Sequence, residues 1–87
     1  MAPDHPSVLD TAGWIYYLQG ELSKAEPSLL RAVRLDPFDP QIQYHLGLLL
    51  LKQGRQAEAR EALERSLRSS RIFSEAADAR SELQSIK

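Results

Sequence analysis

Two histidines and twelve acidic side chains are the groups of this chain that could transfer protons or bind a metal ion. His5 and His45 are 40 residues apart, and neither has a second ligand four residues away along a helix. A protein zinc site needs three or four such ligands held together. Asp36 and Asp39 each precede a proline, a setting typical of turns and helix caps. We therefore expect no metal site and no catalytic carboxylate pair.

The chain also lacks the residue patterns of covalent catalysis and of nucleotide binding. It has no cysteine, and its serines are neither in a nucleophile-elbow motif nor beside a histidine and an aspartate. There is no glycine-rich phosphate loop. We expect no catalytic residue, no cofactor and no enzymatic activity.

Charge and hydropathy narrow the class of partner. Eleven basic and twelve acidic side chains leave a net charge of −1, whereas nucleic-acid-binding domains usually carry a basic excess. The arginines of the second half alternate with glutamates, which favours a solvated helix face over an anion-binding patch. The longest apolar run, 48–51, is far below the ~20 residues of a membrane span. We expect neither nucleic-acid binding nor membrane insertion.

The sequence contains a repeat of 34 residues, and the helices of this repeat must position any functional site. A shift of 34 places Gly13 on Gly47 and Gly20 on Gly54 without a gap. The same shift pairs further identical residues: Pro6 with Pro40, Ala25 with Ala59, Leu29 with Leu63 and Arg31 with Arg65. A period of this length indicates stacked helical hairpins.

Apolar spacing, prolines and glycines predict five helices and no strand, over 7–19, 23–35, 40–53, 55–69 and 75–86. Gly20 and Gly54 are expected to end the first and third helices. Asp39 should cap the third, and Ser23 with Glu26 should form a capping box on the second. The last helix should cover the second repeat with its stripe of Ala76, Ala79, Leu83 and Ile86.

Gly13 and Gly47 fall inside helices, where each costs about 1 kcal/mol relative to alanine. That cost is explained if the backbones of two helices come close at these positions. Ala25, Ala32 and Ala59 would supply the matching small surface of the second helix in each repeat.

The sequence resembles the tetratricopeptide repeat (TPR) family over nearly its whole length. The matching positions of the first unit are Leu9, Ala12, Gly13, Tyr16, Gly20, Ala25, Leu29, Ala32 and Pro37. Those of the second are Gln43, Leu46, Gly47, Leu50, Gly54, Ala59, Leu63, Ser66 and Arg71. Gln43 and Arg71 depart from the family pattern, which has an aromatic residue and a proline there. The phrases around Trp14 and Ala77 resemble bacterial members.

The resemblance implies an all-α solenoid in one domain, 1–87, with repeats 6–39 and 40–73 and a capping helix at 74–87. It also implies a groove lined by the first helix of each repeat, binding a protein or peptide. The residues that would line this groove are Asp10, Trp14, Tyr17, Gln41, Tyr44, Leu48 and Leu51. Few opposing charges are expected at these residues, so salt should affect binding little. The lysine–asparagine pair with which some TPR domains hold a carboxylate is missing.

Two alternatives stay open. The same side chains could pack within the core or between the repeats. Because repeat arrays usually need three or more units, the chain could instead self-associate as a homodimer or form the C-terminal end of a longer array with no ligand of its own.

Overall fold

The computed structural model describes residues 5–69 and 71–86. Its elements are α1 (Pro6–Leu18), α2 (Leu22–Leu35), α3 (Pro40–Lys52), α4 (Gln56–Arg68) and α5 (Ala76–Ser85). No strand occurs in the described part of the chain. The predicted all-helical fold is confirmed, and each helix boundary lies within three residues of its expected place.

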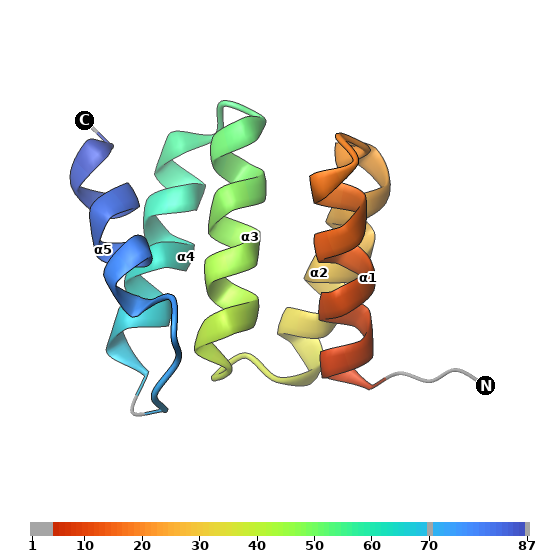
Figure 1. The fold of residues 1–87 in the computed structure, drawn as a ribbon, viewed down its shortest axis with the longest axis horizontal. Coiled ribbons are helices and arrows are strands. Elements are labelled where there is room, and N and C mark those ends of the chain that lie inside the picture. The colour runs from red at the N-terminus through yellow and green to blue at the C-terminus, as the bar shows by residue number, and fades with distance from the viewer. Residues whose placement is uncertain (1–4, 70, 87) are drawn as a thin grey trace.

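The helices form two hairpins and a cap (Figure 1). Helix α1 packs mainly on α2, and α3 packs mainly on α4. The hairpins meet where α3 contacts both α2 and α1, while α5 packs against α4. The helices therefore follow one another across the molecule in chain order, as in a solenoid.

Helix ends follow from local chemistry at most positions. The Asp39 carboxylate accepts hydrogen bonds from the backbone N–H groups of Gln41 and Ile42, as predicted for the α3 cap. Gly20 and Gly54 have φ angles of 78° and 77°, which glycine adopts without a steric cost. Around each, paired backbone bonds close the preceding helix in a Schellman motif.

The predicted capping box on α2 is wrong. Helix α2 begins at Leu22, and its N-cap residue, Glu21, makes no side-chain capping bond. Glu26 instead accepts hydrogen bonds of 3.0 Å from Gln53 and from Arg55. These charge-assisted bonds lower the pKa of the Glu26 carboxyl and tie the first hairpin to the turn of the second.

Each hairpin closes on a contact between a glycine and a leucine. A Cβ atom placed on Gly47 would lie 2.8 Å from two atoms of the Leu63 side chain. A Cβ on Gly13 would lie 2.6 Å from Leu29. Both leucines are completely buried. The mid-helix glycines thus permit the close approach that the sequence predicted.

One apolar core runs from α2 through the second hairpin and under the cap. Its buried members are Ala25, Leu29, Tyr44, Leu46, Leu49, Leu50, Ala59, Ala62, Leu63, Ala79 and Ile86. Ala79 and Ile86 bring α5 into this core, and Leu83 and Phe73 pack against it. The end of the chain therefore covers the last repeat, as the apolar stripe predicted.

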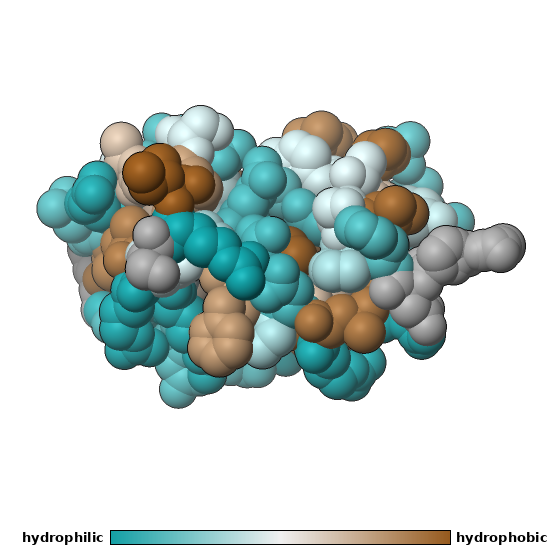
Figure 2. All heavy atoms as spheres, turned by 90° about the horizontal axis from the view of Figure 1, so that it is seen from below, coloured by the Kyte–Doolittle hydropathy of each residue, from teal (hydrophilic) through white to brown (hydrophobic). Residues whose placement is uncertain are grey.

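Apolar side chains also remain on the surface. Seen from below, they form separate groups among hydrophilic residues (Figure 2). Val8, Ile15 and Leu18 of α1 belong to the exposed set. Within the described residues, no helix combines the length and the apolar content needed to cross a bilayer.

Replacing Gly47 with leucine should destabilise the protein by several kcal/mol, because overpacking a tight contact usually costs about 1–3 kcal/mol or more. Urea unfolding would measure the loss. The surface substitution Glu64→Gln should change the stability by less than about 0.5 kcal/mol.

A Leu63→Ala background tests the assigned contact directly. The added cost of Gly47→Leu should shrink there, because the atoms that oppose the new side chain are gone. Equal costs in both backgrounds would contradict the proposed glycine–leucine packing.

Candidate partner-binding face

The seven residues expected to line a groove lie on α1 and α3, which pack side by side. Trp14, Tyr17, Leu48 and Leu51 are half-buried, whereas Tyr44 is buried. We call these five residues the aromatic face. Of the two polar members, Asp10 is buried and Gln41 is exposed.

The aromatic rings of the face form a continuous stack. The Trp14 ring lies 4.8 Å from the Tyr17 ring at an interplanar angle of 11°. The Trp14 ring also stacks on the ring of His45, with ring centroids 4.1 Å apart and an interplanar angle of 16°. Tyr44 is tilted against both His45 and Phe73. The stack thus extends from α1 across α3 to the segment before α5.

A buried hydrogen bond holds this stack in place. The Nδ1 atom of His45 lies 2.7 Å from Oδ1 of Asp10, so the imidazole N–H donates to the carboxylate. Both side chains are almost fully inaccessible to solvent. A directional bond between α1 and α3 therefore fixes the ring on which Trp14 stacks.

His45 is buried, although its place in the sequence is that of a partly exposed helix residue. It is one of four buried polar or charged residues in the described chain. The 34-residue shift equates His45 with Thr11, a short exposed side chain, so the repeat pattern carried no indication of its burial. The only available indication was a histidine beside an apolar run with an aspartate in the neighbouring helix.

The cap brings carboxylates to the aromatic face, which sequence spacing did not show. Burial raises the pKa of the Tyr44 hydroxyl, and the negative charges of Asp78, Glu82 and Glu75 raise it further. Burial and then Glu82 raise the pKa of Tyr17 in the same way. The premise that few charges adjoin these residues is therefore wrong.

We call the carboxylates of Glu75, Asp78 and Glu82 the acidic edge, and Gln41 is linked to it. Its side-chain amide donates a 3.2 Å hydrogen bond to Glu75. The carboxylates of α5 and its N-terminal flank thus border the aromatic face where the cap meets α3, and a cationic group approaching that edge would meet negative charge.

Comparison with known proteins decides the family. The family model described as tetratricopeptide repeat matches residues 11–81, which is most of the chain. The chain belongs to the tetratricopeptide repeat family. A TPR repeat-containing protein of Pseudomonas aeruginosa is 48% identical over 45 residues, 52% of this chain. The matched stretch spans only 8% of that longer protein.

TPR repeats generally mediate protein–protein interaction, and the family is typically non-catalytic. In this TPR chain, the two repeats place an aromatic stack and an acidic edge on neighbouring helices. Such an arrangement can bind a partner by ring burial and orient it by charge.

Replacing Asp10 with alanine should destabilise this TPR protein by about 1–3 kcal/mol, because it leaves the buried His45 nitrogen without its acceptor. The Trp14 fluorescence should change as well, since its stacking partner is released. Thermal and urea unfolding would measure the loss.

Thr11→Ala is the matched control, because Thr11 is an exposed polar neighbour on the same helix. If the Asp10 and Thr11 variants were equally stable, the buried pair would contribute nothing to the joint between the repeats.

Proposed function

We propose that this chain is a protein-interaction module whose aromatic face binds a peptide or a partner helix. The module is one domain, 1–87, made of repeats 6–39 and 40–73 with the capping helix at 74–87. Its binding residues are Asp10, Trp14, Tyr17, Gln41, Tyr44, Leu48 and Leu51. The observation that carries the proposal is the half-buried Trp14–Tyr17 stack.

The stack suits recognition because its rings are already ordered. Trp14 is held by Tyr17 on one contact and by His45 on another, so its conformational freedom is lost before any partner binds. Preorganised aromatic side chains are the usual anchors of interfaces, since burial of a ring then costs little entropy. Asp10 is buried and contributes to the site by positioning His45.

The acidic edge specifies the chemistry of the partner. Asp78 and Glu82 are near enough to raise the pKa of Tyr44, and Glu75 bonds to Gln41. A partner segment that fits this face carries an apolar or aromatic anchor followed by lysine or arginine. Its binding should weaken as salt screens the carboxylates.

A panel of tryptophan-free helical peptides tests this function, because Trp14 is the only tryptophan of the chain. Peptides with an aromatic anchor and lysines should shift its emission to the blue, with affinities of about 1 µM or weaker. Matched peptides with glutamate in place of lysine should bind less well at low salt.

Tyr17→Ala should weaken peptide binding, whereas Phe38→Ala removes an exposed aromatic ring from outside the face and should not. An Asp78→Asn/Glu82→Gln variant should lose most of the salt dependence. Trp14 emission that stays constant with every peptide would reject this face as the binding surface.

A second function rests on a different observation. Val8 and Ile15 of α1 are 54% and 49% exposed, yet their repeat equivalents, Ile42 and Leu49, are 2% and 0% exposed. The difference arises because α3 packs on α2, while this face of α1 has no corresponding helix in the described chain. A cavity of about 400 Å³ lies along it, beside Ser7 and Thr11.

On α3, the equivalent face is covered by α2. A further helix, placed against α1 as α2 is placed against α3, would therefore fit the exposed face of α1. We therefore infer, as the alternative function, structural association through α1, either with a second copy or as part of a longer array. The much greater length of the Pseudomonas relative is compatible with an array.

Light scattering over a range of concentrations tests association of this chain with itself. A dimer through α1 should dissociate on Ile15→Lys, which places a charge within the apolar stripe, and should tolerate Gln56→Lys on α4. A mass that stays monomeric at all concentrations would exclude the homodimer.

A further inference from the structure

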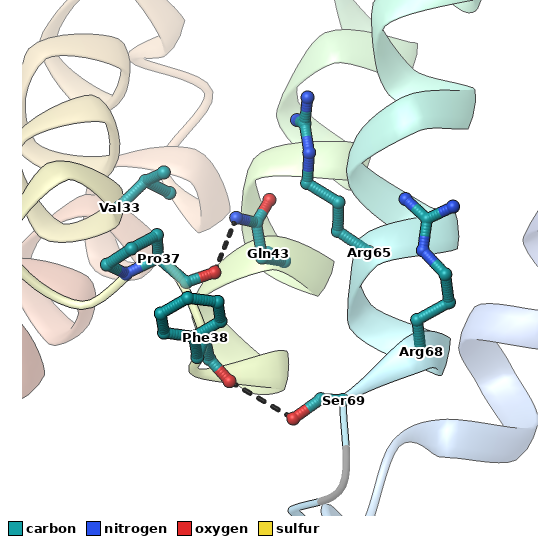
Figure 3. A pocket seen from close by; sticks show the side chains of 7 residues that line it. All are labelled: Val33, Pro37, Phe38, Gln43, Arg65, Arg68 and Ser69. Carbon is teal, nitrogen blue, oxygen red and sulfur yellow. Dashed lines mark hydrogen bonds between the residues drawn. The ribbon is translucent and has the colours of Figure 1, made fainter.

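We propose that a cavity at the α2–α3 connection is a second binding site, for a small organic anion that has an apolar body and an adjacent hydrogen-bond donor. The cavity has a volume of about 630 Å³, within the range of ligand pockets. Its lining comes from α2, the following turn, α3 and α4: Val33, Pro37, Phe38, Gln43, Arg65, Arg68 and Ser69 (Figure 3). None of these residues belongs to the aromatic face.

The deciding group is the side-chain amide of Gln43. This side chain is 2% exposed, and its nitrogen donates a 3.0 Å hydrogen bond to the carbonyl oxygen of Pro37. Its oxygen is buried and has no hydrogen-bond partner in the described structure. The two ends cannot be exchanged, because the oxygen would then face the Pro37 carbonyl. An unsatisfied buried acceptor is costly and requires an explanation, which a ligand donor provides.

Two arginines supply the anion-binding part of the cavity wall. Arg65 and Arg68 extend from α4 along one side of the space (Figure 3). Arg65 has only a loose contact of 3.7 Å with Glu61, and its side chain is half-exposed. Guanidinium groups bind carboxylates through paired N–H donors, so this wall fits a carboxylate.

The carboxylates of the adjoining turn, Asp36 and Asp39, are engaged elsewhere, whereas an anion at Arg65 would compete with the loose, exposed contact of Glu61. Asp36 accepts two hydrogen bonds from Arg71, at 2.9 and 3.2 Å, which lower the pKa of its carboxyl. Asp39 caps the N-terminus of α3.

The opposite wall is apolar and already in place. Phe38 is 73% exposed, which is unusual for a phenylalanine and leaves its ring free to cover a ligand. The turn that carries Pro37 and Phe38 is held from two helices. Gln43 binds the Pro37 carbonyl from α3, and Ser69 donates a 3.1 Å bond to the Phe38 carbonyl from the end of α4. The site is therefore built before a ligand arrives.

These walls together define one ligand chemistry. A carboxylate faces the arginines, an N–H group next to it reaches the Gln43 oxygen, and an apolar side chain lies against Val33 and Phe38. N-acylated α-amino acids with apolar side chains combine these three groups. The same groups occur at the end of a peptide chain, so a small metabolite and a peptide terminus are the two sources.

Titration of the ¹⁵N-labelled protein with N-acetyl-L-phenylalanine tests the site by NMR. The expected result is saturable shifts at the cavity residues with about millimolar affinity, the order set by so small a ligand. The carboxamide analogue, which lacks the charge, should bind about tenfold more weakly. Binding of a peptide with C-terminal phenylalanine at least as tight as that of the acetyl compound would show that the site accepts a peptide terminus. A peptide that fails to bind, while the acetyl compound binds, would identify a free metabolite as the source.

Variants separate the two polar contacts. Arg65→Gln/Arg68→Gln should lose about tenfold in affinity for the acid, while Lys52→Gln, which removes a charge at the far end of α3, should lose none. Gln43→Met should remove the preference of the wild type for the N–H compound over its N-methyl analogue. Unfolding curves of each variant show that the fold is intact.

Two results would overturn the proposal. One is the absence of saturable shifts at the cavity at concentrations well above millimolar. The other is binding that neither the arginine pair nor Gln43 affects, since the ligand would then lie elsewhere.

Discussion

The close contact of Gly13 with Leu29, repeated by Gly47 with Leu63, is the constraint on which the rest of the structure depends. At each glycine, an added Cβ would lie closer to the leucine than side-chain atoms normally approach. Because both hairpins close in the same way, α3 and α4 repeat the geometry of α1 and α2. Two equal hairpins can then stack, and the stacking sets the place of every surface described above.

The joint between the hairpins uses a different kind of contact. Apolar packing holds helices together but is not directional, whereas the Asp10–His45 bond has a fixed length and direction. A buried polar pair adds little net stability after its desolvation cost, yet it penalises any packing that separates the partners. Here the pair aligns α1 with α3, and the rings of Trp14 and His45 stack as a consequence.

Sequence patterns predicted most of the features that arise within one repeat, the capping box of α2 excepted. Helix positions, the glycine turns and the Asp39 cap depend on local backbone chemistry, and the close helix approach at Gly13 and Gly47 follows from the paired period. That leucines, and not the expected alanine side chains, lie nearest these glycines was not predicted. Contacts between the repeats could not be predicted from these sequence patterns. The burial of His45, the bonds from Glu26 to the next turn and the carboxylates of α5 beside Tyr44 each depend on the angle between packed elements. The side-chain oxygen of Gln43 lacks a hydrogen-bond partner because the turn at Pro37 places a carbonyl against the nitrogen of the same amide.

A comparison of the two repeats shows which positions make the contacts that sequence patterns did not predict. Small residues at the close approach inside each hairpin are identical after the shift of 34, as with Gly13 and Gly47 and with Ala25 and Ala59. Other positions differ between the repeats: Thr11 is replaced by His45, and Leu9 by Gln43. Identity thus accompanies the packing that both hairpins share, since the same backbone approach demands the same small residue. Difference accompanies the contacts that only one hairpin makes. The rings of the aromatic face and Gln43 of the cavity lie at positions of the second kind, whereas the cavity arginines Arg65 and Arg68 repeat Arg31 and Arg34. At the differing positions the repeat pattern gives no information, and only the packed structure brings the residues together.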